Sequence, residues 1–256
     1  MEVAAVIPAR MHSKRLPGKP LLRIAGVPMI VRVLEKVKAC PQLSRVIVAT
    51  DDENIFRTVE EYGGEAWMTS PHHRSGSDRV AEVAAGLSEE LILNVQGDEP
   101  LLPASTIRIL VDFALGCRDL TVVTAMVPLP RERDISNPNI VKVVADRCGK
   151  ALYSLRLPIP YRKDSPLNLS AGASSGRLLA GYFKHIGVYL YRREFLLRYV
   201  NFAPTPLEAS ESLEQLRILE NGFPVYAVQV EEDSVSVDTA DDLEAVEALI
   251  EQREAK

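Results

Sequence analysis

The sequence predicts an α/β protein built around a mixed, mostly parallel sheet. Short apolar runs alternate with longer amphipathic stretches along the chain, which is typical of β-α-β units. The continuous apolar run at 91–95 precedes Gln-Gly-Asp-Glu-Pro, as expected of a buried strand that ends in a tight turn. The 256 residues can bury a sizeable core, and 46% hydrophobic with 25% charged residues excludes collagen-like, disordered and disulfide-scaffold classes.

The first half of the chain alternates regularly. Residues 3–7 predict the first strand and residues 45–50 the second, with a helix over 28–39 between them, where a proline suits the first helical turn. Asp51 and Asp52 then begin another helix. Strand and helix therefore follow each other as in β-α-β units around a mostly parallel sheet.

The second half is less regular. Residues 158–178 are rich in proline, serine and small residues, which indicates a long excursion or a second lobe. Strands are predicted at 120–127, 140–144, 185–191 and 225–230, and helices at 213–220, with Gly222 as its stop, and at 241–253.

Charge and cysteine content exclude several classes. Lys and Arg number 30 against 35 Asp and Glu, and a net charge of −5 argues against a general nucleic-acid-binding protein. No apolar run approaches the roughly 18 residues of a membrane span, and the N-terminus lacks a signal-peptide pattern, so we expect a cytoplasmic protein. Three widely spaced cysteines predict neither a disulfide framework nor a zinc-ligand pair.

A basic loop follows the first strand. No acidic residue occurs between Glu2 and Glu35, and residues 8–20 contain three prolines, a glycine and the cations Arg10, Lys14, Arg15 and Lys19. Such a loop can surround a polyphosphate, because cations and backbone N–H groups offset several negative charges together. An ordinary solvated loop is the alternative. Neither a Walker A motif nor G-x-G-x-x-G is present.

Two distant aspartates are candidate metal ligands. Asp98 follows the buried strand at 91–95, and Asp238 follows the alternating Val-Ser-Val at 235–237, which we interpret as another strand end. Mg²⁺ commonly takes one or two carboxylates together with substrate phosphates. The alternative is that each aspartate only caps the helix after it.

One motif suggests a different class of enzyme. Residues 172–176 match G-x-S-x-G, the nucleophile elbow of serine hydrolases, with Ser174 at its centre. No strand precedes it, no acid lies between Ser174 and His185, and no histidine follows His185. The catalytic order of these hydrolases therefore cannot be formed, and a small-residue loop is favoured.

Five motifs together resemble one known family, the 3-deoxy-manno-octulosonate (Kdo) cytidylyltransferases, or CMP-Kdo synthetases. They cover nearly the whole chain. They are Ile-Pro-Ala-Arg at 7–10 continued by Arg-Leu-Pro-Gly-Lys-Pro-Leu at 15–21, Asn-Val-Gln-Gly-Asp-Glu-Pro at 94–100, His-Ile-Gly-Val-Tyr at 185–189, Leu-Glu-Gln-Leu-Arg at 213–217 and Val-Asp-Thr at 237–239.

The resemblance implies a three-layer fold like that of the nucleotide-diphosphosugar transferases. One nucleotidyltransferase domain would span 1–256, with a smaller sugar-binding and dimerisation lobe inserted at about 128–210. It also implies transfer of CMP from CTP to Kdo, with release of pyrophosphate, for lipopolysaccharide biosynthesis by a cytoplasmic homodimer. Basic residues and Mg²⁺ are the expected equipment for such a transfer.

The resemblance also assigns roles to individual residues. Arg10, Arg15, Lys19, Asp98 and Asp238 would be catalytic, and the two aspartates would bind Mg²⁺. The nucleotide would further contact Ser13, Ser75, Gly76, Asp78, Arg79 and Gln96. Arg156 would pair with the Kdo carboxylate, which suits a fork-shaped guanidinium, and the sugar hydroxyls would face His185, Tyr189, Glu214 and Gln215.

Three alternatives stay open. The acceptor could instead be a related acid such as 8-amino-Kdo or a sialic-acid-like sugar, or a polyol phosphate. The carboxylate-pairing Arg156 favours an ulosonic acid over a phosphorylated alcohol. A non-catalytic sugar-nucleotide-binding regulator is the alternative from another class, and retention of both Asp98 and Asp238 argues against it, since a pure binder needs neither.

Overall fold

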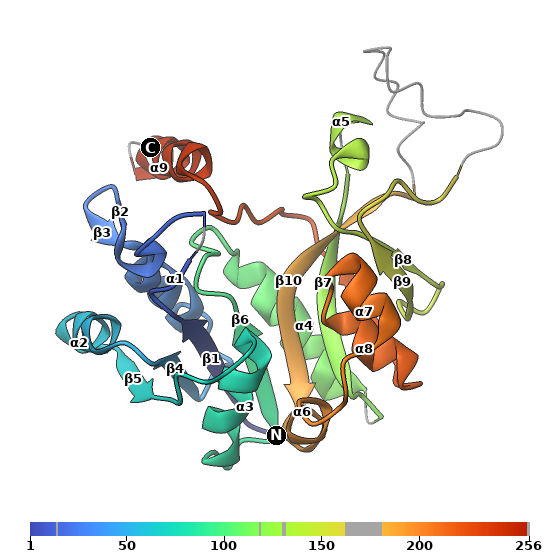
Figure 1. Cartoon of the computed structure of the whole chain (residues 1–256), viewed down its shortest axis with the longest axis horizontal. Coiled ribbons are helices and arrows are strands. Elements are labelled where there is room, and N and C mark those ends of the chain that lie inside the picture. Colours follow the sequence, from blue (N-terminus) through green and yellow to red (C-terminus); the bar gives the residue numbers. More distant parts are fainter. Residues whose placement is uncertain (14, 118, 130–131, 162–180, 255–256) are drawn as a thin grey trace.

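The computed structural model describes residues 1–13, 15–117, 119–129, 132–161 and 181–254. Within them a nine-stranded sheet has the order β11-β7-β10-β6-β1-β4-β5, with β8 and β9 branching from β10 (Figure 1). Its strands are β1 (Val3–Ala9), β4 (Arg45–Thr50), β5 (Glu65–Met68), β6 (Leu91–Val95), β7 (Val122–Pro128), β8 (Lys142–Ala145), β9 (Ala151–Leu155), β10 (Phe183–Arg192) and β11 (Val225–Gln229). A separate hairpin joins β2 (Arg23–Ile24) and β3 (Val27–Pro28).

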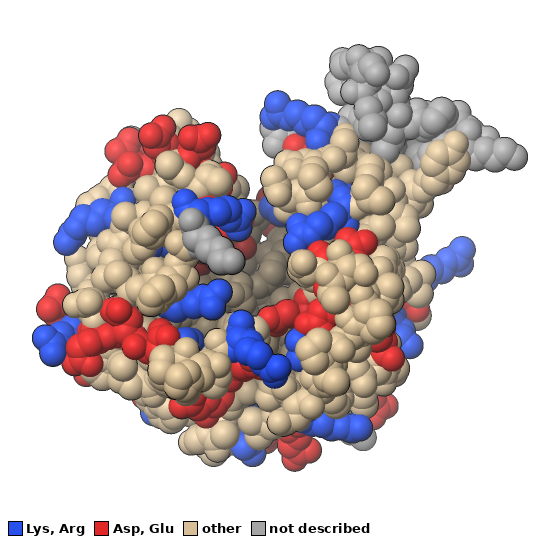
Figure 2. All heavy atoms as spheres, viewed as in Figure 1, with Lys and Arg blue, Asp and Glu red and all other residues tan. Residues whose placement is uncertain are grey.

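Helices cover both faces of the sheet, as the sequence predicts. They are α1 (Met29–Lys38), α2 (Glu53–Glu61), α3 (Gly76–Ala85), α4 (Ala104–Gly116), α5 (Glu132–Ser136), α6 (Arg193–Tyr199), α7 (Pro206–Glu211), α8 (Gln215–Glu220), α9 (Ala240–Glu254) and the short 3₁₀ helix η1 (Lys19–Leu21). Figure 2 shows the molecule hollowed along its middle, between the part that carries α9 and the β2–β3 hairpin and the part that carries β8, β9 and α7.

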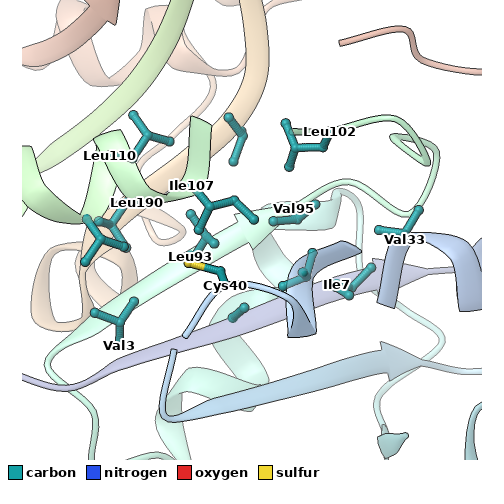
Figure 3. Packing of buried hydrophobic residues seen from close by; sticks show 14 of the residues in the cluster. Val3, Ile7, Val33, Cys40, Leu93, Val95, Leu102, Ile107, Leu110 and Leu190 are labelled. Atoms are coloured by element: carbon teal, nitrogen blue, oxygen red, sulfur yellow. The ribbon is translucent and has the colours of Figure 1, made fainter. Parts of the chain in front are cut away.

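The alternation of β1 separates two hydrophobic layers. Val3 and Ile7 pack with α1 and α4 (Figure 3), whereas Ala4 and Val6 face the layer that contains α3, α6 and α8. All seven residues of β1 are buried, because a central parallel strand is covered on both faces and therefore carries an unbroken apolar run. The core thus lies on each side of the strands whose ends form the site.

The sheet is mostly parallel but not uniformly so. β6, β1, β4 and β5 run parallel to one another, and β11 runs parallel to β7, while β10 is antiparallel to both β6 and β7. The predicted mixed, mostly parallel sheet is confirmed. Since β1 and β6 are parallel neighbours, the loops after them emerge at the same edge.

Several predicted elements are confirmed closely. The strands at 45–50 and 91–95 have the predicted bounds, and the helix predicted over 28–39 spans Met29–Lys38. Asp52 caps α2, its Oδ1 accepting hydrogen bonds from Asn54 N at 2.9 Å and Ile55 N at 3.2 Å. Most of the excursion predicted at 158–178, including the Ser174 motif, lies outside the described residues.

One predicted strand is wrong. Residues 235–237 lie outside the β-strands of the described chain. The segment is held instead by a hydrogen bond from Val237 N to Asp98 O at 2.9 Å, and the Val237 side chain is buried with Ile24 and Val246. There the chain crosses the loop after β6 rather than joining the sheet.

None of the described helices is long and apolar enough to cross a membrane.

Gly97 marks a close approach between the loops after β1 and β6. A Cβ placed there would lie 2.9 Å from the Pro8 carbonyl oxygen, so the backbone would have to move. We predict that Gly97→Ala lowers the free energy of unfolding by about 1–3 kcal/mol, as overpacking typically does. Chemical denaturation measures it.

Gly116→Ala is the matched control, because a Cβ at the last residue of α4 meets nothing within 4 Å. This variant should keep or slightly raise the free energy of unfolding, since alanine is the better helix former. Equal stability of the two variants would contradict the packing argument.

Candidate active site

A cavity of about 680 Å³ opens at the edge of the sheet where β1 and β6 end. Its walls come from the basic loop, the start of α3, the loop after β6 and the segment before α9. They include ten of the residues singled out from the sequence: Arg10, Ser13, Arg15, Lys19, Ser75, Gly76, Arg79, Gln96, Asp98 and Asp238. The parallel order of the strands thus brings to one concave surface residues as distant in the chain as Arg10 and Asp238.

Hydrogen bonds within the basic loop fix its conformation before η1 begins. Gly18 has φ +68°, the left-handed conformation that glycine adopts readily, and its N–H donates to Met11 O at 3.3 Å. The Ser13 hydroxyl accepts from Leu16 N at 3.3 Å. These contacts place Lys19 at the first turn of η1, facing the acidic residues of the cavity. Lys14 lies outside the described residues.

The two predicted metal ligands converge on one cation. Lys19 Nζ lies 2.5 Å from Asp98 Oδ2 and 3.1 Å from Asp238 Oδ1, and Arg15 Nη2 lies 2.8 Å from the same Asp238 oxygen. Among the described residues no cluster of three or more His, Cys, Asp or Glu could hold a metal. Two hard carboxylates around one cationic centre fit Mg²⁺, which commonly takes its other ligands from water and substrate phosphates.

Asp238 is brought to Asp98 by a backbone hydrogen bond between their segments rather than by a strand end. Val237 N donates to Asp98 O, so the two segments cross next to the two predicted metal ligands. Asp242 Oδ2, in the first turn of α9, accepts from Asp238 N at 3.0 Å and from Thr239 N at 2.9 Å. The start of α9 therefore fixes the backbone that carries Asp238.

Arg79 is the most buried cation of the cavity wall, with 3% of its surface exposed. Asp51 Oδ2 lies 3.1 Å from Arg79 Nη2, and the Thr69 hydroxyl contacts Nη1. Ser75 caps α3 by accepting from Asp78 N at 3.2 Å. The guanidinium is thus held by polar groups from the ends of β4 and β5 while it faces the cavity, a preorganised donor for a polar ligand.

Gln96 is oriented from the sheet. Its Nε2 donates to Asn94 Oδ1 at 3.1 Å, and Asn94 is fully buried on β6. Gly76 leaves room for the amide, since a Cβ there would lie 3.4 Å from Gln96 Oε1. The Gln96 side-chain amide, which comes from the loop after β6, therefore lies against the start of α3.

The six other predicted residues lie outside the described wall of this cavity. Asp78 is in the first turn of α3, His185 and Tyr189 are on β10, Glu214 and Gln215 are at the start of α8, and Arg156 follows β9. Helix α3, which carries Asp78 and Arg79, contacts the start of α8 through the Ser77 hydroxyl, which donates to Glu214 Oε2 at 2.8 Å.

β10 carries a bulge between Ile186 and Tyr189 in its pairing with β7, and Thr124 compensates for it. The Thr124 hydroxyl lies 2.8 Å from Val188 O, 3.0 Å from Ile186 O and 2.9 Å from His185 Nε2. Burial lowers the pKa of His185 to about 4, so the imidazole is neutral near pH 7. Burial also raises the pKa of Tyr189 well above its ordinary value.

Arg156 binds backbone carbonyls on two neighbouring segments. Its Nε donates to Glu211 O at 2.9 Å and Nη1 to Pro138 O at 3.0 Å, while its backbone N–H donates to Glu211 Oε2 at 3.1 Å. The guanidinium is therefore fixed between α7 and the turn before β8.

The structure adds residues that the sequence did not single out. Glu99 is buried beside Asp98, burial raises its pKa to about 7, and the Ser234 hydroxyl contacts it. His12 and His73 also line the cavity, although their spacing in the sequence matches no zinc-binding motif. Asp51 and Thr69 contact the Arg79 guanidinium. The only sequence signal for this role is their position directly after β4 and β5, because the carboxyl ends of the strands meet at the ligand-binding edge of the sheet.

The chain is similar to cytidylyltransferases over its whole length. The family model described as cytidylyltransferase matches residues 4–234. The 3-deoxy-manno-octulosonate cytidylyltransferase of Trichlorobacter lovleyi is 46% identical over 98% of this chain and 100% of its own, and that of Geobacter metallireducens is 45% identical over 96% of each.

Solved structures agree. A CMP:2-keto-3-deoxy-manno-octonic acid synthetase solved in complex with CTP superposes with a TM-score of 0.90 at 37% identity, over 99% of this chain and 100% of the other. A cytidylyltransferase from Leptospira borgpetersenii, at 17% identity and a TM-score of 0.62, shares the fold. With the cavity described above, these similarities show that the chain belongs to the 3-deoxy-manno-octulosonate cytidylyltransferase family.

Proposed function

We propose that the protein transfers CMP from CTP to 3-deoxy-manno-octulosonate and releases pyrophosphate. The observation that carries this is the convergence of Lys19, Asp98 and Asp238 in one cavity, in a chain 46% identical to an enzyme of that name. The acceptor hydroxyl would form a bond to the α-phosphorus of CTP, and the bond to pyrophosphate would break. The protein's part is to position both reactants and offset charge.

The cations of the basic loop would hold the triphosphate. Arg10, Arg15 and Lys19 line the same cavity, where they can offset several phosphate charges. Ser13 would contribute a hydroxyl to the phosphates. Ser75, Gly76, Arg79 and Gln96, which line the same cavity, would contact the nucleoside together with Asp78 from the first turn of α3. Arg79 is already held in place by Asp51.

Asp98 and Asp238 would hold Mg²⁺. Both carboxylates already approach one cationic centre and are partly exposed to the cavity, at 30% and 39% of the side chain. When bound, the ion would polarise phosphate oxygens and offset the charge of the leaving pyrophosphate. Lys19 and Arg15, which pair with these carboxylates in the structure, would then be available to phosphate oxygens.

The acceptor would lie between the cavity and the β8–β9 hairpin. Arg156 would pair with its carboxylate, and His185, Tyr189, Glu214 and Gln215 would contact its hydroxyls. The Ser77–Glu214 hydrogen bond supports this arrangement, because it joins the nucleotide-binding helix α3 to the start of α8. Gln215 Nε2 is buried without a hydrogen-bond partner among the described residues, which leaves a donor for an acceptor hydroxyl.

Further features of the family are proposed for this chain as well. We propose one nucleotidyltransferase domain over 1–256 with a smaller lobe at about 128–210, a homodimer, a cytoplasmic location and a role in lipopolysaccharide biosynthesis. They follow from the family relationship, and size-exclusion chromatography with light scattering tests the dimer.

The reaction is tested by pyrophosphate release from the purified protein with Mg²⁺, CTP and Kdo. Separate wells replace CTP by ATP, GTP or UTP, and Kdo by 8-amino-Kdo, sialic acid or a polyol phosphate. We expect release with CTP and Kdo only. Release with another acceptor alone would overturn the sugar assignment, and silence in every well would favour a sugar-nucleotide-binding regulator.

Asp98→Asn should lower kcat by on the order of 100-fold or more, because it removes a carboxylate from the metal site while it keeps the side-chain volume. Thermal unfolding should stay close to wild type. Asp112→Asn, which changes a surface aspartate that accepts from Gln42 Nε2, is the control and should leave kcat unchanged. Wild-type turnover by Asp98→Asn would remove Asp98 from the mechanism.

Arg156→Ala should raise the KM for Kdo by about ten-fold or more and the KM for CTP by much less, since it removes one partner of a charge pair with the acceptor. Initial rates with each substrate varied at saturating levels of the other measure both constants. Arg147→Ala, at an exposed arginine in the turn between β8 and β9, is the control. Equal increases in both constants would contradict the carboxylate-pairing role.

A further inference from the structure

Lys142 is a fully buried lysine, with 0% of its surface exposed, and it lies outside the nucleotide cavity. Its ammonium donates to three backbone carbonyls: Asn137 O at 2.8 Å, Ile140 O at 2.7 Å and Arg156 O at 2.5 Å. An ammonium has three N–H donors, so all of them are used. Burying a charge is costly without such partners, which indicates that this position requires a cation with several donors.

Lys142 lies where three segments of the smaller part of the fold meet. The turn 137–140 precedes β8, and the end of β9 pairs with β8 at Leu155 opposite Lys142. On its other side β8 joins β10, and His185 N donates to Val141 O at 2.9 Å. The ammonium therefore ties the end of β9 to the turn, beside the strand that carries His185.

The same turn serves two cations. Its carbonyls at 137 and 140 accept from Lys142, and Pro138 O between them accepts from Arg156 Nη1. Besides its contacts with Glu211, Arg156 is thus held at its backbone carbonyl by Lys142 and at its guanidinium by the turn that Lys142 contacts.

Lys142 and Arg156 are neighbouring cations, and such a pair favours the binding of an anion. Burial and the nearby Arg156 lower the pKa of Lys142 to about 8, and Glu211 is the carboxylate that opposes this shift. One carboxylate for two cations leaves local positive charge in a chain whose net charge is −5. An acceptor that carries a carboxylate would complete the balance.

We propose that Lys142 is a positioning residue for the acceptor, which holds Arg156 where its guanidinium can pair with the acceptor's carboxylate. This inference rests on the proposed function and adds to it a residue that does not itself touch substrate.

Lys142→Met tests it, with Lys150→Met as the matched control, because Lys150 lies in the same hairpin and is exposed. With pyrophosphate release as the assay, Lys142→Met should raise the KM for Kdo by about ten-fold and leave the KM for CTP nearly unchanged. Lys150→Met should change neither constant. A KM for Kdo in Lys142→Met equal to that of Lys150→Met would overturn the proposal.

A double variant separates positioning from general structural support. If Lys142 acts through Arg156, Lys142→Met should have no further effect on the KM for Kdo once Arg156→Ala is present. A full additional increase in the double variant would overturn the positioning role. A wild-type protein inactive with CTP and Kdo would instead overturn the proposed function, and the acceptor role of Lys142 with it.

The wild-type protein provides a second measurement, which applies even where Lys142→Met does not fold. The charged groups that face Lys142 are Arg156 after β9 and Glu211 at the end of α7, with Lys184 opposite it on β10. Loss of the lysine proton removes one of the three donors, so between pH 7 and pH 9 the KM for Kdo should rise several-fold, with a flat KM for CTP. A KM for Kdo that stays flat across this range would overturn the proposal.

Discussion

The crossing of two distant segments at the edge of the sheet is the constraint on which the site depends. Val237 N donates to Asp98 O, and this single backbone contact brings the carboxylate after β6 and the carboxylate before α9 to the same ammonium. α9 maintains the crossing from the far side, because Glu247 Oε1 accepts from Ala25 N of the β2–β3 hairpin at 2.6 Å. The C-terminal helix, which begins two residues after Asp238, therefore supports both this aspartate and the β2–β3 hairpin.

The fold was predictable where one local signal decides the structure. The runs at 45–50 and 91–95 are short, mostly apolar and followed by turn residues, as expected of buried strands. The Val-Ser-Val at 235–237 has the alternation of a strand, yet a contact with the loop after β6 decides its position. α4 was not predicted, because its largely apolar sequence shows little contrast between its faces.

Some residues of the candidate site could also be predicted from a local signal in the sequence, and others could not. The basic loop and the two aspartates carry charge in an unusual local pattern, and the structure brings them to one cavity. Lys142 carries no such signal, since its partners are backbone carbonyls whose identity leaves no trace in the side chains. The link from α3 to α8 was equally hidden, because Ser77 and Glu214 are 137 residues apart and their contact depends on how the two faces of the sheet are covered.

Lys19 and Asp238 are separated by 219 residues, and this distance along the chain has a consequence during synthesis. A ribosome that has synthesised the basic loop, β1 and β6 has produced only one of the two carboxylates that contact Lys19. The second arrives with the last elements of the chain, and α9 must then dock against the β2–β3 hairpin. The surroundings of Lys19 are therefore complete only after residues 238–254 have been synthesised and have packed against the first part of the chain.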